Sequence, residues 1–259
     1  MIAAVARIAV GACVLAPASA GASAARPAVS LSASPAHVTL VGAAQATIHL
    51  ANSGRSPVVV DAGRAGFGLD LRGRPKIVSG DRARRVAAWL TLRPQRLSLQ
   101  PGASADLIVS SALPSRPQPG DHDALVLLTS RPAHGVRVAV RMRLGIVVVV
   151  HVPGAIVRRL ELRRLRVRRA GRARVLELFI ANRGNVTETL RRDRVTVSLR
   201  RHGRTLARLR PKERELLPRT SGIAEFPYRG RLRGWVTALA AISRVRGTAG
   251  AHRAFRVRL

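Results

Sequence analysis

The chain has 259 residues, of which 47% are hydrophobic and 3% aromatic, so its core must consist of Val, Leu, Ile and Ala, and global disorder is excluded. It carries 46 basic and 13 acidic residues, a formal net charge of +33. Only Lys76 and Lys212 are lysines, so the other 44 basic residues are arginines, and a field of this strength attracts polyanions.

The first 24 residues have the three parts of a secretory signal peptide. Arg7 is the only charge, the apolar run Ile8 to Ala16 follows, and the small-residue triplets Ala18 to Ala20 and Ala22 to Ala24 come next. The apolar run is far shorter than the roughly 20 residues of a membrane-spanning helix. An alanine-rich disordered N-terminus is the alternative, but it does not explain the order of the parts. We predict a signal peptide at residues 1–24 and a mature chain that is secreted or associated with the cell envelope.

The only cysteine, Cys13, lies inside this signal peptide. The mature chain is therefore expected to have no disulfide, no thiol nucleophile and no cysteine metal site. A lipid anchor at Cys13 is not expected either, because only two residues separate Arg7 from the tetrad Val10 to Cys13. No stretch after residue 24 is apolar enough to predict a transmembrane segment.

Residues 25–154 alternate between apolar and polar positions with a period of two, the pattern of β-strands with one buried face. Pro and Gly interrupt the alternation at short intervals, which is typical of a β-sandwich. Asp81 to Leu90 is the one segment for which we expect a helical turn. The glycine-rich segment from Gly63 to Gly73 is not followed by a helix, so we predict a flexible loop there. The alternating apolar positions include Val38, Leu40, Ile48, Leu50, Leu97, Leu99, Leu107, Val109, Val136, Val138 and Val140.

Residues 155–259 show the same pattern, with about seven predicted strands. The apolar positions change phase at Arg163 and Arg164, so we predict a β-bulge that keeps these arginines out of the core. Arg201 to Gly203 is predicted to be a hairpin turn. The chain is therefore predicted to be all-β, with two tandem immunoglobulin-like β-sandwich domains at 25–154 and 155–259.

No constellation of residues predicts catalysis. The seven histidines show no zinc-binding spacing, and no serine has the context of an acyl-transfer nucleophile. His122 lies between Asp121 and Asp123, an arrangement that suits either a hard cation or, more simply, a polar turn. We predict a non-enzyme without cofactor or metal.

Clustered arginines are the strongest chemical signal, because guanidinium groups bind phosphate and carboxylate through two parallel hydrogen bonds. The alternative is a solvated sheet face in an arginine-rich proteome. The residues predicted to bind a polyanion are Arg158, Arg159, Arg163, Arg164, Arg166, Arg168, Arg169, Arg191, Arg192 and Arg194.

Several turn and strand motifs resemble those of the WxL-interacting surface protein family. The resemblance implies an N-terminal domain of the peptidoglycan-binding type followed by a second immunoglobulin-like domain. The chain departs from that family because it ends at Leu259 without the usual C-terminal transmembrane helix. The motifs lie at Leu97 to Gly102, Leu113 to Pro114, Pro119 to Asp121, Arg143 to Gly154, Asn182 to Val186 and Leu216 to Pro218.

These observations lead to one main hypothesis and two alternatives. The main one is a secreted, non-catalytic adaptor that contacts peptidoglycan or an anionic cell-wall polymer and a second surface protein. The first alternative is a periplasmic-type chaperone for surface subunits, which an exposed strand edge with basic residues at the domain cleft would favour. The second is a basic nucleic-acid-binding protein, which the scarcity of aromatic residues disfavours.

Overall fold

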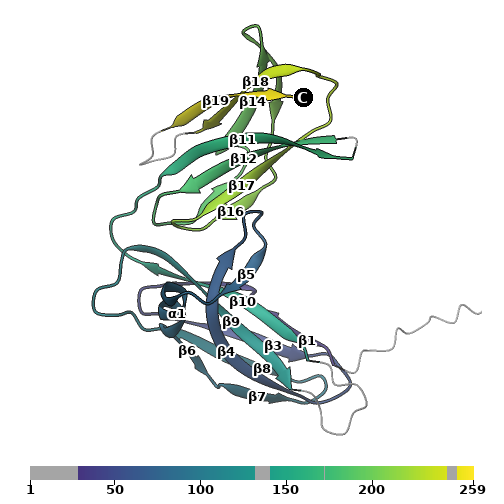
Figure 1. Cartoon of the computed structure of the whole chain (residues 1–259). Coiled ribbons are helices and arrows are strands. Elements are labelled where there is room, and N and C mark those ends of the chain that lie inside the picture. The colour runs from purple at the N-terminus through teal and green to yellow at the C-terminus, as the bar shows by residue number, and fades with distance from the viewer. Residues whose placement is uncertain (1–28, 132–140, 172, 244–249) are drawn as a thin grey trace, which may run out of the picture.

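The computed structural model describes residues 29–131, 141–171, 173–243 and 250–259. The predicted signal peptide and the predicted strand positions Val136, Val138 and Val140 lie outside them. The chain forms two lobes joined by residues 153–159 (Figure 1). Within the described residues, no helix has the length and hydrophobicity needed to cross a bilayer.

Lobe 1 consists of two packed sheets and the helix α1 (Asp81–Ala88). One sheet has the order β1-β3-β8-β6, and the other has the order β2-β10-β9-β4-β5, with β7 also pairing with β4. The strands are β1 (Leu31–Ser34), β2 (His37–Val41), β3 (Gln45–Asn52), β4 (Val58–Leu69), β5 (Pro75–Val78), β6 (Leu90–Arg93), β7 (Arg96–Leu99), β8 (Ser104–Ser111), β9 (Gly120–Arg131) and β10 (Arg143–Val152).

Lobe 2 has a three-stranded sheet, β11-β12-β17, and a four-stranded sheet, β15-β14-β18-β19. Strands β13 and β16 pair with each other in a separate two-stranded sheet. The strands are β11 (Leu160–Ala170), β12 (Ala173–Asn182), β13 (Glu188–Leu190), β14 (Val195–Arg201), β15 (Arg204–Leu209), β16 (Arg214–Leu216), β17 (Ser221–Tyr228), β18 (Trp235–Ile242) and β19 (Ala251–Arg258).

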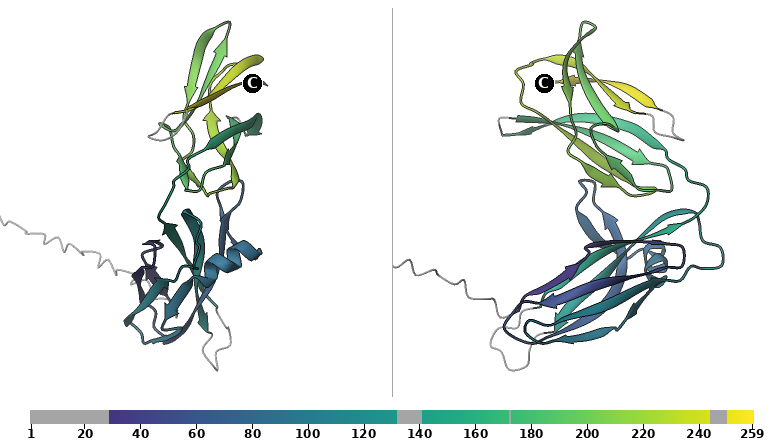
Figure 2. Two further views of the ribbon diagram at one scale, coloured as in Figure 1. Left: turned by 90° about the vertical axis from the view of Figure 1, so that its left-hand side faces the viewer. Right: turned by 180° about the vertical axis from the view of Figure 1, so that it is seen from behind.

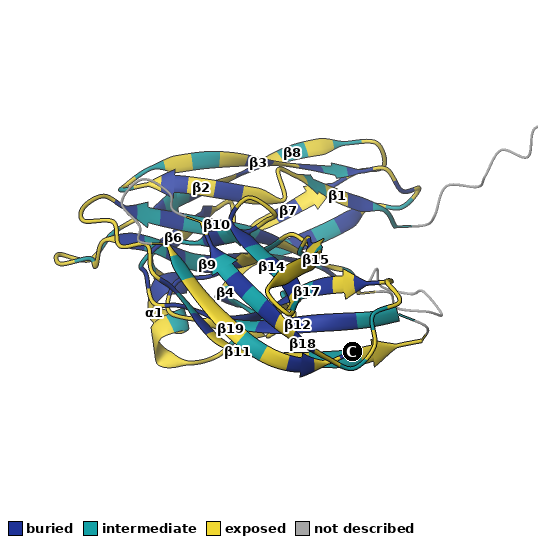
Figure 3. Ribbon diagram, turned by 90° about the horizontal axis from the view of Figure 1, so that it is seen from above, coloured by how far each residue is buried: buried dark blue, intermediate teal, exposed yellow. Residues whose placement is uncertain are grey.

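Each lobe has its own core, built from alternate positions of facing strands. In lobe 1, Leu50 of β3 and Val126 of β9 belong to one buried cluster. In lobe 2, Leu176 of β12 and Val197 of β14 belong to another. Figure 3 shows the underlying alternation of buried and exposed residues along the strands. The all-β prediction is confirmed.

Three local predictions can be compared with the structure. The register between β11 and β12 shifts between Leu162 and Arg164, as predicted for a β-bulge. The hairpin between β14 and β15 turns at His202 and Gly203, whose φ angles of 47° and 78° suit a tight hairpin turn. The expected helical turn is the longer helix α1, with the bounds given above.

The prediction of a flexible loop at Gly63 to Gly73 was wrong for most of its length, because strand β4 continues to Leu69. A Cβ atom on Gly66 would lie 2.4 Å from the Cβ of Ala83 in α1 and 2.4 Å from the carbonyl oxygen of Val78 in β5. Glycine is needed here so that the helix and the neighbouring strand can approach β4 closely. The close approach places α1 beside the junction of the lobes.

Candidate functional site: the pocket between the two lobes

The β4–β5 hairpin extends from lobe 1 and docks on lobe 2 (Figure 2). At its tip, the carbonyl oxygen of Leu71 accepts hydrogen bonds from the Ile223 N–H at 2.8 Å and from Nη1 of Arg214 at 2.6 Å. The next residue, Arg72, donates to Oε1 of Glu177 at 2.8 Å and also pairs with Glu225. The hairpin is therefore tied to three strands of lobe 2, namely β12, β16 and β17.

Glu177 is fully buried on the outer side of the β11-β12-β17 sheet. Besides Arg72, it accepts hydrogen bonds from Nε of Arg166 at 2.6 Å and Nε of Arg168 at 2.7 Å. Burial alone would raise the pKa of Glu177, but the hydrogen bonds from the three arginines outweigh it and lower the pKa to about 2. The glutamate is therefore ionised and fully paired.

A second contact between the lobes surrounds Asp121 in β9. Its backbone N–H donates to the Asn185 carbonyl at 2.8 Å, and its Oδ2 accepts from the Thr187 N–H at 2.7 Å. Its Oδ1 lies 2.7 Å from Nδ1 of His151. The preceding Gly120 has a φ of 113°, and a Cβ there would lie 2.0 Å from the Asn185 oxygen, so only glycine fits this close approach.

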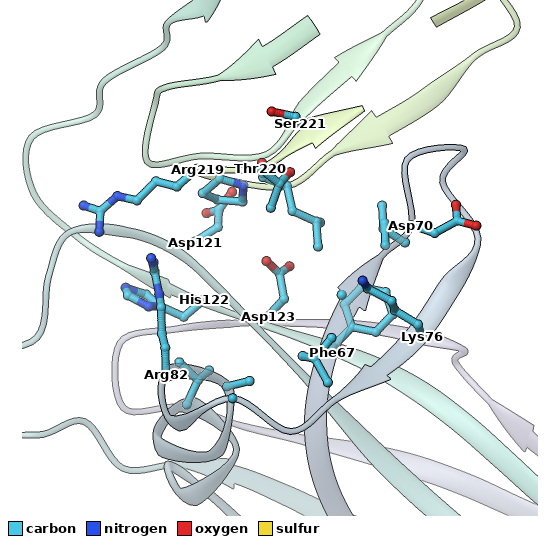
Figure 4. A pocket seen from close by; sticks show the side chains of 18 of the residues that line it. Phe67, Asp70, Lys76, Arg82, Asp121, His122, Asp123, Arg219, Thr220 and Ser221 are labelled. Atoms are coloured by element: carbon cyan, nitrogen blue, oxygen red, sulfur yellow. Dashed lines mark hydrogen bonds between the residues drawn. The ribbon is translucent and has the colours of Figure 1, made fainter. Parts of the chain in front are cut away.

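Between these two contacts lies a pocket of about 720 Å³ (Figure 4). Lobe 1 supplies residues from β4, β5, α1 and β9, and lobe 2 supplies the segment Leu217 to Ser221. Most of the lining surface is apolar. The polar residues that line it come from both lobes, and those labelled in Figure 4 are Asp70, Lys76, Arg82, Asp121, His122, Asp123, Arg219, Thr220 and Ser221.

Asp123 is the unusual group of this pocket. Its Oδ1 atom is inaccessible to solvent and has no hydrogen-bond partner among the described residues. Burial, together with the nearby charges of Asp121 and Glu215, raises the pKa of Asp123 to about 7. A group in this state can donate a hydrogen bond when protonated or accept one from a cation when ionised.

The cation site that the sequence allowed around His122 does not form. Strand alternation turns His122 away from Asp121 and Asp123, and its Nε2 lies 2.7 Å from the Gln118 carbonyl. Its ring centroid lies 4.8 Å from that of Trp89. Burial lowers the pKa of His122, so the ring is neutral at pH 7. Its position is that of a core histidine.

Positive charge gathers at one end of the pocket. Arg82 comes from α1, and Arg219, with a φ of 57°, comes from the lobe 2 segment and donates to Oε1 of Gln118 at 2.9 Å. Burial and the nearby charge of Arg219 lower the pKa of Arg82. Both arginines also line an adjoining cavity of about 570 Å³, to which Arg85 and Arg116 contribute. This end of the junction suits an anionic group.

An apolar surface extends from the pocket over the outer side of β4, β9 and β10. Phe67, Leu125 and Leu217 form its buried centre. Ala65, Leu69, Leu127 and Val147 are partly exposed around them. An apolar area of this kind beside a pocket is typical of a binding surface.

One edge of β10 is open beside this apolar surface. Strand β2 runs parallel to β10 but pairs only with Val147 to His151. The Met142 carbonyl accepts a hydrogen bond from the Ser130 N–H of β9, so the even-numbered residues of β10 form their backbone hydrogen bonds with β9. The odd-numbered residues Arg143 and Gly145 therefore direct their N–H and C=O groups to the other side of β10. In the described structure no strand of the sheet pairs with that side of Arg143 to Ile146. The open edge can accept one more strand.

The ten arginines predicted to bind a polyanion do not form one surface. Arg166 and Arg168 pair with Glu177, and Arg164 lies 4.1 Å above the Phe179 ring. Arg194 is buried and paired with Glu188 at 3.1 Å. The other six are exposed. Three of these pair with carboxylates: Arg158 with Glu188, Arg163 with Glu161 and Arg191 with Asp193. The remaining three are Arg159, Arg169 and Arg192. Polyanion binding stays a prediction.

Sequence reasoning missed Arg82 and Arg219, which line the pocket, and Arg72, which ties the hairpin to lobe 2. It named Asp123 only as part of a cation site around His122. The one available signal was Asp123, a carboxylate directly before the apolar run Ala124 to Leu128. The three arginines gave no signal because they are a few among the 44 of the chain, and their positions in the structure depend on how the lobes pack.

Comparisons with solved structures show which known folds the chain resembles. No family model and no curated protein matches the chain. A chain of a chaperone–tip adhesin complex from CFA/I fimbriae biogenesis matches with a TM-score of 0.50 and 11% identity, covering 87% of this chain and 98% of that one. The class 5 fimbriae chaperone CfaA matches with a TM-score of 0.50 and 10% identity, with the same coverage. At this identity the likeness shows a shared fold.

The main hypothesis from the sequence was wrong. It assigned a cell-wall adaptor that contacts peptidoglycan or an anionic wall polymer, but the similar structures are fimbrial chaperones. The physical reason is visible in the arginines. Six of the ten arginines that suggested a polymer surface are paired with carboxylates of the chain itself, as at Glu177. The resemblance to the WxL-interacting family stays a prediction.

Proposed function

We propose that the chain is a non-catalytic, extracytoplasmic chaperone that holds an extended segment of a surface subunit. The segment pairs with the open edge of β10 and places side chains over the apolar surface and into the pocket. The two lobes act as two immunoglobulin-like domains, divided near residues 152–157. The shared fold with fimbrial chaperones supports this role.

The observation that carries the proposal is the continuity of edge, apolar surface and pocket. Gly145 lies at the open edge, Val147 belongs to the apolar surface two residues on, and Phe67 belongs to both that surface and the pocket lining. An added strand gains main-chain hydrogen bonds at the edge and side-chain contacts on the face. Arg82 and Arg219 then meet an acidic group of the bound segment.

The edge is tested with Gly145→Pro, which removes the outward N–H without removing a hydrogen bond to β9. Gly145→Ala is the matched control because it keeps the N–H. Fluorescence anisotropy would measure the binding of a labelled nine-residue peptide that alternates Val and Thr. We expect the proline variant to bind at least tenfold more weakly than wild type and the alanine variant to bind within about threefold.

Amide hydrogen exchange locates the peptide on the chain. We expect the peptide to slow exchange at Arg143 and Gly145, whose amides point to the open edge, and to leave Leu144, already paired with β9, unchanged. Equal binding by the proline and alanine variants, or no protection at Arg143 and Gly145, would overturn the proposal.

A further inference from the structure

The four-stranded sheet of lobe 2, β15-β14-β18-β19, has an exposed outer side, here called the distal face. Its inner side packs the lobe 2 core through Val197, Ala238 and Val257. Alternation therefore turns the residues between them outward. Arg200, Thr237 and Arg256 form one cross-strand row on this face.

The distal face carries no internal counter-charge. The sequence has no Asp or Glu between residues 194 and 212 or after Glu225, so none of the four strands contains a carboxylate. Their arginines include Arg200, Arg208, Arg256 and Arg258. The β11-β12-β17 sheet differs, because its strands carry Glu177 and Glu225, which pair with Arg166 and Arg168.

Trp235, at the start of β18, provides an apolar centre. It is 54% exposed, and the guanidinium of Arg256 lies 4.9 Å from its ring centroid. Two backbone hydrogen bonds of 3.0 Å between Gly234 and Leu259 hold the strand end. A hollow of about 380 Å³ adjoins the ring, and its lining includes Arg200, Arg201, His202, Phe255 and Arg256. A fixed, exposed Trp among arginines has the composition of an interface hot spot.

We propose that the distal face binds an acidic polypeptide segment of a partner protein. Carboxylates of the segment pair with Arg200 and Arg256, and an apolar side chain covers the indole of Trp235. A second copy of this chain carries the same formal charge of +33, which opposes its association with an arginine-rich face. A single exposed indole does not provide the row of aromatic rings on which successive bases of single-stranded nucleic acid stack.

The apolar content of the hollow also favours a polypeptide. Trp235, Val236 and Phe255 lie beside the arginines, so the occupant must present apolar and anionic groups next to each other. Alternating acidic and apolar side chains do so along one extended segment, whereas the apolar groups of a nucleic acid are its flat bases, which need a row of aromatic rings to stack on. This site is separate from the pocket between the lobes, so the proposal goes beyond the chaperone role.

Tryptophan fluorescence provides the test, since the chain has two tryptophans. In a Trp89→Phe background, Trp235 alone reports binding, even if a probe also binds elsewhere. The probes are a ten-residue peptide that alternates Glu and Leu, its Gln and Leu counterpart, poly-glutamate, and a single-stranded oligonucleotide. We expect the Glu and Leu peptide to quench Trp235 and to bind at least tenfold more tightly than the other three.

Arg256→Gln should weaken that binding about tenfold, whereas the control Arg192→Gln, an exposed arginine elsewhere in lobe 2, should change it less than twofold. Thermal melts would confirm that both variants fold. Equal weakening by both variants, binding of the oligonucleotide or poly-glutamate as tightly as of the peptide, or no change in Trp235 fluorescence would each overturn the proposal.

Discussion

Glu177 and Asp123 both lie where the lobes meet, yet the protein treats these two carboxylates in opposite ways. Glu177 is surrounded by Arg72, Arg166 and Arg168, and its pKa falls to about 2. Asp123 has an Oδ1 atom without a partner among the described residues, and its pKa rises to about 7. Burial raises the pKa of both, so the arginines make the difference. The first contact is complete within the chain, while the second faces a pocket where a ligand can complete it.

The largest effect is expected from removing the charge at the complete contact. Glu177→Gln leaves three arginines around a neutral, buried amide, and loss of one partner from a buried ion cluster costs about 3 kcal/mol of unfolding free energy. Urea unfolding at pH 7 measures this loss. Glu213→Gln is the control, because Glu213 is exposed, and its unfolding free energy should stay within about 0.5 kcal/mol of wild type.

The difference in unfolding free energy between wild type and Glu177→Gln should depend on pH. Because the folded-state pKa of Glu177 is lowered, its contribution is present above the unfolded value of 4.5 and is lost as the pH falls towards about 2. Wild type should therefore lose more stability than Glu177→Gln between pH 5 and pH 2. Parallel pH profiles for the two proteins would show that Glu177 is not held ionised by its arginines.

Much of the fold, but little of the pocket, could be predicted from the sequence. Strands and the β-bulge at Arg163 and Arg164 follow from alternation within a few residues. The turn residues Asn52 and Asn182 occupy equivalent corners of the two lobes, and each donates through Nδ2 to the backbone four residues on.

The pocket instead depends on contacts between distant residues. Arg72 reaches Glu177 across 105 positions of the chain, and no local pattern indicates that pair. The β4 glycines resembled a loop because the reason for Gly66, the close approach of Ala83, lies on a helix further along. Local spacing also cannot tell an arginine that meets a carboxylate from one that meets solvent.

A smaller effect, of opposite sign, is expected at the open contact. Because the folded-state pKa of Asp123 is raised, its contribution is present below the unfolded value of 3.8 and is lost as the pH rises through about 7. Asp123→Asn cannot ionise, so at pH 8 it should be more stable than wild type by about 2 kcal/mol. The difference should shrink as the pH falls below 7 and should vanish below about pH 3.8, where the carboxyl is protonated in both the folded and the unfolded state. The exposed control Asp193→Asn should show no such pH-dependent gain. A loss of stability at pH 8 in Asp123→Asn would contradict the inference that the ionised Asp123 carboxylate is buried without a partner among the described residues.

The smallest effect on stability, but a clear one on geometry, is expected from Arg72→Ala. Arg72 is about one-third exposed, so its loss should cost only about 1 kcal/mol, yet it joins the β4–β5 hairpin to Glu177 and Glu225. Spin labels at Thr47 in lobe 1 and Arg192 in lobe 2 of residues 25–259 would report the distance between lobes, since Cys13 lies outside that range. We expect a broader distance distribution than in wild type. Arg74→Ala, on the same hairpin, should keep the wild-type distribution, because Ala preserves the backbone N–H that donates to Asp70. If the two variants gave the same distribution, Arg72 would not be what fixes the lobes around the pocket. The backbone contact at Leu71 would then fix them instead.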